Sequence, residues 1–263
     1  MANWSKIESD AKTWIYAAGE TIRQSFQNVL QIQSKSNPDD LVTNMDKETE
    51  QYLISKINET YPEHRILGEE GFGHDIQSLE GIVWIVDPID GTMNFVHQQR
   101  NFAISIGIYE DGVGQVGLIY DVVHDELYHA VKGKGAYMND YRLPELKDVP
   151  LNQAVIALNA TWVMENKRFD HNLLVPVAKA VRGTRSYGSA TLEFAYVASG
   201  RLDAYITLRL APWDFAAGLI LLDEVGAKAT TLDGEKINLI GQNSIFVAKK
   251  GIHSTILKDY LQK

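Results

Sequence analysis

The chain has 263 residues, of which 22% are charged, and its net charge is -9. A chain of this length buries about 70–75% of its unfolded surface, so it needs no disulfide or metal merely to fold. The acidic balance argues against unspecific binding to nucleic acid or to an anionic membrane, although bound cations would still admit an anionic substrate. The absence of cysteine excludes disulfides, thiolate metal sites and cysteine nucleophiles.

The N-terminal segment "MANWSKIESDAKTW" has no basic patch followed by an apolar run, so no signal peptide is predicted. The longest apolar runs, around 215–222, fall well short of a membrane span. We therefore expect a cytoplasmic protein that has neither a membrane nor a nucleic acid as its partner.

Two helices are predicted at the start of the chain. Apolar residues recur at three- and four-residue spacing from Trp4 to Val29, which indicates an amphipathic helix of about seven turns. After a polar loop, a second helix is expected to begin near Thr43, because Thr43 and Asp46 match the pattern of a capping box. Pro62 ends this second helix.

The rest of the first half is predicted to be mostly β-structure. A short strand in "HRIL" runs into the acidic, glycine-rich loop "GEEGFGHD", and a buried strand follows at 82–86. Antiparallel strands are expected over 102–137, with turns at 110–112 and 133–135. Residues 141–153 form a connector with two prolines.

The second half mixes helices and strands. Strands are predicted at 154–159, 203–207, 227–231 and 244–248, and helices at 170–181, 190–199, 215–225 and the C-terminus. This mixture predicts an α+β layered sandwich, a single domain in two lobes of about 1–145 and 146–263 without a clear linker.

Acidic residues stand at the ends of the predicted strands. Asp87 follows the apolar run of "WIVDPIDGTMNF" and Asp90 comes three residues later, while Glu69 follows the preceding strand. Strand ends suit binding sites, and without cysteine or histidine pairs a metal here would be oxygen-bound, with Mg²⁺ fitting best. The two aspartates could hold two ions roughly 4 Å apart, and the Ile89 carbonyl is free to point at one of them.

Each of these acidic residues also has a plainer interpretation. Asp-Pro and Asp-Gly are typical of turns, and "GEE" alone is typical of a solvated loop. Asp214, in "PWDFAAG", is typical of a helix N-cap, and Asp46 has its place in the capping box. Thr92 is either an ordinary N-cap or a partner of Asp46, and the amides that follow Gly91 could hold a phosphate if a helix starts there.

No other catalytic pattern competes with this one. The seven histidines show no HExxH spacing, and neither a GxSxG elbow nor a Walker A loop occurs. Serine hydrolases and P-loop nucleotidases are therefore disfavoured.

Five ordered motifs together resemble those of the inositol monophosphatase family, the Mg²⁺-dependent, lithium-sensitive phosphatases, and the resemblance covers about residues 5–260. They are "KSNPDDLVTNMD" at 35–46, "GEE" at 68–70, "DPIDGT" at 87–92, "GSATLEFAYVASGRLDAY" at 188–205 and "PWDFAAG" at 212–218. The resemblance implies a five-layered αβαβα sandwich of the inositol monophosphatase / fructose-1,6-bisphosphatase type, and a homodimer.

The resemblance also implies the roles of the site residues. Two Mg²⁺ ions would share the ligands Glu69, Asp87, the Ile89 carbonyl, Asp90 and Asp214, with a third, weaker ion touching Glu69. Asp46 and Thr92, helped by Glu69, would activate a metal-bound water. Substrate contacts would come from Asp90, Gly91, Thr92, Gly188, Ser189, Ala190 and Asp214.

The implied activity is hydrolysis of inositol 1-phosphate, but one residue departs from the pattern. Thr207 stands seven residues before Asp214, where inositol-specific members carry a glutamate that grips ring hydroxyls. Arg185 and Arg209 lie nearby in the sequence and could bind a more anionic substrate, or could belong to the surface or a dimer interface. Fructose 1,6-bisphosphate, a 3′-phosphoadenosine nucleotide and NADP therefore remain alternative substrates, and a regulatory protein retaining the fold is a further alternative. A purely structural metal module would not explain Asp46 and Thr92.

Overall fold

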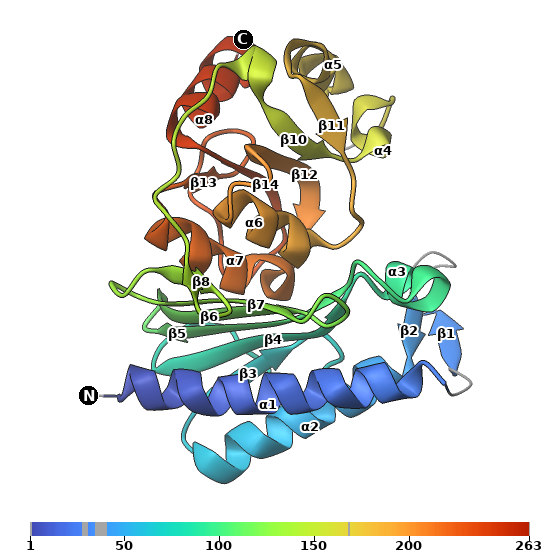
Figure 1. The fold of residues 1–263 in the computed structure, drawn as a ribbon, viewed down its shortest axis with the longest axis vertical. Helices are drawn as coiled ribbons and strands as arrows, with labels where there is room; N and C mark the ends of the chain where they lie inside the picture. Colours follow the sequence, from blue (N-terminus) through green and yellow to red (C-terminus); the bar gives the residue numbers. More distant parts are fainter. Residues whose placement is uncertain (1, 28–30, 35–40, 168, 263) are drawn as a thin grey trace.

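The computed structural model describes residues 2–27, 31–34, 41–167 and 169–262. Two β-sheets alternate with three layers of helices (Figure 1). From the bottom of Figure 1 the layers are α1 and α2, a seven-stranded sheet, α6 and α7, a five-stranded sheet, and an outer layer of short helices. The predicted five-layered αβαβα sandwich is confirmed.

The first sheet is almost entirely antiparallel, and only its β3–β4 pair is parallel among the described strands. Its spatial order follows the sequence: β3 (Arg65–Gly68), β4 (Ile82–Asp90), β5 (Ala103–Glu110), β6 (Val113–Asp121), β7 (Glu126–Val131), β8 (Ala136–Met138) and β9 (Tyr141–Arg142). Along β4, Trp84 and Val86 pack toward α1 and α2, whereas Val83 and Ile85 pack toward the central helices. Because both faces of the strand are covered, its sequence is an unbroken apolar run.

Helices α1 (Trp4–Ser25) and α2 (Asn44–Thr60) cover the outer face of this sheet (Figure 1). The helix predicted over 4–29 ends earlier, at Ser25, and Val29 lies outside the described residues. The predicted capping box is present at the start of α2, where Thr43 and Asp46 exchange hydrogen bonds. A two-stranded sheet of β1 (Ile32–Ser34) and β2 (Leu41–Thr43) precedes α2 and was not predicted.

The second sheet has the order β11-β10-β12-β14-β13, and β10 runs parallel to both of its neighbours. Its strands are β10 (Val155–Leu158), β11 (Gly183–Arg185), β12 (Ala204–Leu210), β13 (Lys228–Thr230) and β14 (Asn243–Ala248). The short edge strand β11 lies between the predicted helices 170–181 and 190–199, where no strand was predicted. The outer layer comprises α4 (Ala160–Val163), α5 (His171–Ala180), α8 (Lys250–Ile256) and the π-helical end Leu257–Leu261.

Helices α6 (Ala190–Ala198) and α7 (Pro212–Glu224) fill the space between the sheets (Figure 1). Helix α7 packs against Gly107 and Gly117, which are paired across β5 and β6. A Cβ atom on Gly107 would lie 2.8 Å from the Cβ of Ala216 and 2.9 Å from the amide nitrogen of Ala217. The two glycines therefore set how closely α7, and with it Asp214, approaches the first sheet.

Candidate active site

The two aspartates of "DPIDGT" lie inside β4 rather than after it. Pairing with β5 continues through Asp87, opposite Ser105, and Asp90, opposite Ala103, so β4 carries one extra residue in this interval. The amide of Ile89 donates to Oδ1 of Asp87 at 3.1 Å. In an unbroken strand, residues three apart point to opposite faces, and the bulge corrects this. The turn interpretation and the predicted strand end at residue 86 were therefore wrong, because a bulge uses the same residue types as a turn.

The bulge brings Asp87 and Asp90 to Asp214 at the start of α7. Carboxylate oxygens of all three residues lie within 4.8 Å of one another. Burial raises the pKa of Asp87 well above its ordinary value, and the charges of Glu69, Asp90 and Asp214 raise it further. Burial and the charge of Asp90 likewise raise the pKa of Asp214. Three buried carboxylates that oppose each other's ionisation, all with hard oxygen donors, fit a divalent cation such as Mg²⁺.

Glu69 joins this group from the loop after β3. It hydrogen-bonds with Asp87, and its amide donates to the Val86 carbonyl at 3.3 Å. The loop is held by Glu50, a fully buried carboxylate of α2 that accepts from the amides of Glu70 at 2.7 Å and Phe72 at 3.0 Å. Glu50 was not among the predicted site residues. Its signal was the spacing of four residues from Asp46, which puts both carboxylates on one face of α2.

Asp46 makes both of the contacts that were considered for it. Its Oδ2 accepts from the Thr43 amide at 2.8 Å and the Thr43 hydroxyl at 2.6 Å, which caps α2. Its Oδ1 accepts from the Thr92 hydroxyl at 3.0 Å. Burial raises the pKa of Asp46, and the hydrogen bonds from Thr43 oppose that rise. The Thr92 oxygen also lies 3.1 Å from the Ile89 carbonyl, so Thr92 stands between Asp46 and one of the predicted metal ligands.

The predicted short helix after Gly91 is present as α3 (Thr92–Gln98). Gly91 adopts a left-handed conformation with φ of 94°, which a side chain rarely tolerates. Asn94 donates to the carbonyls of Asn101 at 2.8 Å and Tyr187 at 2.7 Å. Asn94, which the sequence analysis missed, therefore ties α3 to the loop before α6.

Asp90 is tied to the first turn of α6. Its Oδ2 accepts from the Ser189 hydroxyl at 2.6 Å and from the amide and hydroxyl of Thr191, each at 2.7 Å. Burial raises the pKa of Asp90, and these hydrogen bonds from Ser189 and Thr191 lower it. Ser189 was among the predicted site residues, whereas Thr191, which follows it by two residues, was not.

A cavity of about 230 Å³ opens beside Asp90 and Asp214. Its other lining residues are Asn159, Trp162, Ser186, Gly188, Ser189, Ala190, Glu193, Tyr205, Thr207 and Leu210. Four of the predicted substrate-side residues, Gly188, Ser189, Ala190 and Thr207, are thus brought together at one wall. Trp162, Glu193 and Tyr205 were missed, and burial raises the pKa of Glu193 to about 7.

The two arginines lie differently. Arg185 is exposed on β11, donates to the carbonyl of Thr184 at 2.8 Å and does not line this cavity. Arg209 is also exposed, and its charge acts on Asp214 to lower the pKa of that carboxyl.

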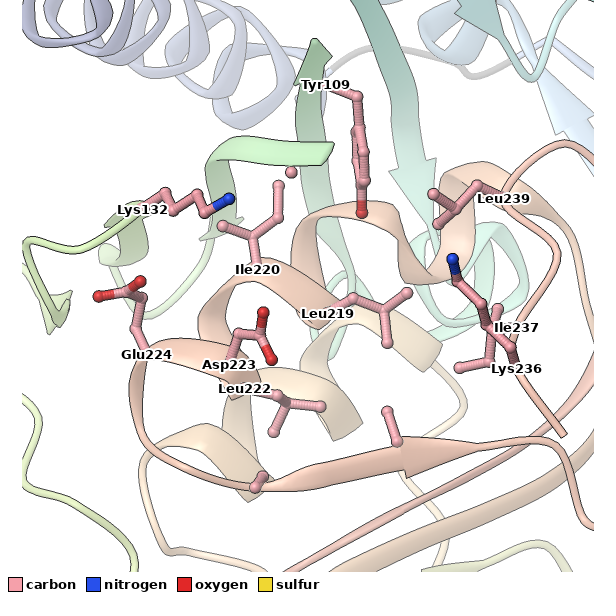
Figure 2. Close-up of a pocket in the computed structure, with 13 residues that line it drawn as sticks. Tyr109, Lys132, Leu219, Ile220, Leu222, Asp223, Glu224, Lys236, Ile237 and Leu239 are labelled. Atoms are coloured by element: carbon pink, nitrogen blue, oxygen red, sulfur yellow. The ribbon is translucent and has the colours of Figure 1, made fainter. Parts of the chain in front are cut away.

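A second cavity, of about 240 Å³, lies toward the other end of α7 (Figure 2). Apolar side chains of α7 and Leu239 surround it, with Lys132 and Lys236 on opposite sides (Figure 2). At its edge the Glu224 carboxylate accepts from the amides of Gly133 and Gly135, each at 2.7 Å. None of the three clustered aspartates lines this cavity. Among the described helices, none has the length and apolarity needed to cross a membrane.

Comparison with known proteins agrees with this geometry. The inositol-1-monophosphatase of Bacillus subtilis (strain 168) is 61% identical over 261 residues, which cover 99% of this chain and 98% of that protein. The 2′AMP-bound structure of SaIMPase-II has a TM-score of 0.89 at 46% identity and covers 98% of this chain and 94% of that one. A structure titled IMPase/NADP phosphatase complexed with Mg²⁺ and phosphate has a TM-score of 0.89 at 29% identity, covering 98% and 95%.

The family comparison covers almost the whole chain and confirms the resemblance seen in the sequence motifs. Residues 3–262 match the inositol monophosphatase family. The chain belongs to the inositol monophosphatase family and is a phosphatase.

Proposed function

We propose that this phosphatase is a Mg²⁺-dependent phosphomonoesterase that hydrolyses inositol 1-phosphate to inositol and phosphate. The observation that carries the proposal is the convergence of Asp87, Asp90 and Asp214 next to a cavity. The Bacillus subtilis relative is named for this activity, and another relative was solved with Mg²⁺ and phosphate. The proposal includes a homodimer and a cytoplasmic location, as expected from the sequence.

The donor set fits two Mg²⁺ ions. Glu69, Asp87 and the Ile89 carbonyl would hold one ion, Asp87, Asp90 and Asp214 the second, and Glu69 would touch a third, weaker one. Bound Mg²⁺ would supply Lewis acidity, lowering the pKa of an attacking water and stabilising charge on the leaving alkoxide. The negative charges of the four carboxylates and the positive charges of two bound dications would nearly cancel. The site would therefore not repel an anionic ester, although the protein as a whole is acidic.

The protein's own groups orient the reaction. The Thr92 hydroxyl, held by Asp46, positions the attacking water and passes its proton to the Asp46 carboxylate. The amides of Gly91 and Thr92 hold phosphate oxygens at the start of α3. Gly188, Ser189, Ala190 and Thr207 face the alcohol part of the substrate, and Arg185 would contribute only to a substrate that extends beyond the cavity.

A broader phosphatase is the second candidate, and Thr207 favours it. Thr207 lines the cavity where inositol-specific members carry a glutamate, and a relative of 46% identity was solved with 2′AMP. Fructose 1,6-bisphosphate, a 3′-phosphoadenosine nucleotide and NADP are the substrates to compare. A panel of kcat/KM values for these three and inositol 1-phosphate separates the candidates, since comparable values on all four indicate a broad enzyme.

The central test is the Asp87→Asn variant. It should lose Mg²⁺-dependent phosphate release while keeping the circular dichroism spectrum of the parent, because the change removes a ligand charge but little volume. Asp170→Asn is the matched control: Asp170 caps α5 away from the site, and asparagine caps equally well. Full turnover by Asp87→Asn would show that the two-metal proposal is wrong.

A further inference from the structure

Thr207 shares its wall of the cavity with Tyr205 and Glu193. We propose that Tyr205 recognises a free hydroxyl group on the alcohol part of the substrate and that Glu193 positions it, so that the pair takes over the task of the missing glutamate. The substrate class is a phosphate monoester of a polyol or sugar with a hydroxyl next to the ester. This inference rests on the proposed function and specifies its substrate side.

The first support is the location of the three side chains. Tyr205 and Thr207 are two residues apart on β12, so they point to the same face of the strand. Glu193 approaches from the first turn of α6. All three are nearly buried, with exposed fractions of 5% for Tyr205, 4% for Thr207 and 6% for Glu193. All three also line the cavity, so a substrate that enters it comes next to them.

The second support is the electrostatic interaction among the three side chains. Burial raises the pKa of Tyr205 and the charge of Glu193 raises it further, whereas the Thr207 side chain lowers it. The Tyr205 side chain in turn opposes the rise that burial causes in the pKa of Glu193. A tyrosine hydroxyl donates once and accepts through its lone pairs. When its proton goes to the ionised Glu193, its oxygen is left as an acceptor. A substrate hydroxyl that donates to this oxygen completes the network.

The third support is that the tyrosine and the carboxylate are both held in place. Glu193 accepts from the Tyr187 amide at 2.8 Å. The rings of Phe194 and Tyr205 pack edge to face, with centroids 5.7 Å apart and an interplanar angle of 83°. Holding the loop amide does not require a tyrosine hydroxyl in the cavity, so a structural role for Glu193 leaves Tyr205 unexplained.

The arrangement differs from a glutamate at 207 in one chemical respect. A carboxylate at position 207 would put a full negative charge on the cavity wall, whereas Glu193 is reached through a neutral hydroxyl. A site built to hydrogen-bond a substrate hydroxyl rejects an analogue that lacks it, because its own polar groups are then left unpaired. The site therefore selects for hydroxyls while tolerating additional anionic groups on the substrate.

The test compares inositol 1-phosphate with cyclohexyl phosphate, which has the same ring and no hydroxyls, in Mg²⁺. The parent enzyme should prefer inositol 1-phosphate. Tyr205→Phe and Glu193→Gln should raise KM for inositol 1-phosphate about 10-fold, the effect of one lost hydrogen bond, with little change in kcat. Neither variant should change kcat/KM for cyclohexyl phosphate. Adding Thr207→Glu to Glu193→Gln should restore the preference, because it returns a carboxylate to the cavity.

Glu224→Gln is the matched control, because Glu224 also holds loop amides with its carboxylate but lies at the second cavity (Figure 2). It should leave both substrates unaffected. Equal losses on the two substrates in Tyr205→Phe, with an unchanged melting temperature, would overturn the inference. A parent enzyme that hydrolyses both substrates without preference overturns it as well. Release of no phosphate from either substrate overturns the proposed function, and this inference with it.

Discussion

Asp90 and Thr191 are joined by two hydrogen bonds, in which the amide and the hydroxyl of Thr191 both donate to Oδ2 of Asp90 at 2.7 Å. The contact links β4 of the first sheet to α6 of the central layer. It fixes the rotation of the Asp90 carboxylate, and with it the direction in which the carboxylate faces Asp87 and Asp214. Groups that orient a metal ligand in this way tune metal affinity.

Thr191→Val should weaken Mg²⁺ binding by about 10- to 100-fold, since it removes the hydroxyl and keeps the shape of the side chain. Isothermal titration calorimetry with Mg²⁺ measures the change. Thr21→Val on α1 is the control, because that hydroxyl bonds to the carbonyl of Ala17 within its own helix. An unchanged Mg²⁺ affinity in Thr191→Val would mean that the remaining contacts suffice to orient Asp90.

Thr92→Val should lower kcat by about 10²-fold or more while changing KM little, because it removes the hydroxyl that we propose positions the water. Thr92→Ser keeps the hydroxyl and should retain most of the activity. Steady-state kinetics with saturating Mg²⁺ distinguish the two variants. A Thr92→Val variant that keeps the kcat of the parent would contradict a role for the hydroxyl and its contact with Asp46.

Gly107→Ala should destabilise the protein by about 1–3 kcal/mol, because the new methyl group meets backbone atoms of α7 that cannot turn aside. Urea unfolding measures the loss. Gly183→Ala, in β11, is the matched control: its Cβ would meet only the end of the Arg185 side chain, at 3.4 Å. Equal stability of the two variants would contradict close packing of α7 on the first sheet.

The metal-free protein should become less stable as pH rises. The folded-state pKa values of Asp87 and Asp214 are raised above the ordinary value of 3.8, so the folded state holds more protons than the unfolded state in the window above pH 3.8. Stability is therefore present below that value and is lost as pH rises through the raised pKa values. Mg²⁺ replaces these protons, so it should raise the melting temperature more at pH 8 than at pH 5. Thermal unfolding with and without Mg²⁺ checks this, and an equal gain at both pH values would contradict it.

The sequence predicts the layered fold and singles out acidic residues that the structure brings together, because both depend on strong local signals. The apolar run before Asp87 indicates a buried strand, and the three- and four-residue spacing after Trp4 indicates α1. The capping box at Thr43 is a local pattern as well, and the structure contains it.

The features that the sequence does not predict are those that depend on contacts between residues far apart in the chain. The bulge after Asp87 exists because pairing with β5 continues past it, and nothing local separates it from a turn. The bond from Thr191 to Asp90 crosses 101 positions, and the place of Glu193 beside Tyr205 follows from packing α6 on β12. Edge strand β11 is only three residues long, too short for a periodic signal.

The packing of α7 on Gly107 and Gly117 determines at what point during synthesis the three carboxylates can come together. Every strand of the first sheet has been synthesised by Arg142, whereas α7 begins only at Pro212. A growing chain therefore passes through a stage in which Asp87 and Asp90 are present but the surface around Gly107 and Gly117 has no helix on it. The cluster of three carboxylates comes into being only when Asp214 arrives on that surface, so an incomplete chain lacks the full donor set of the finished protein.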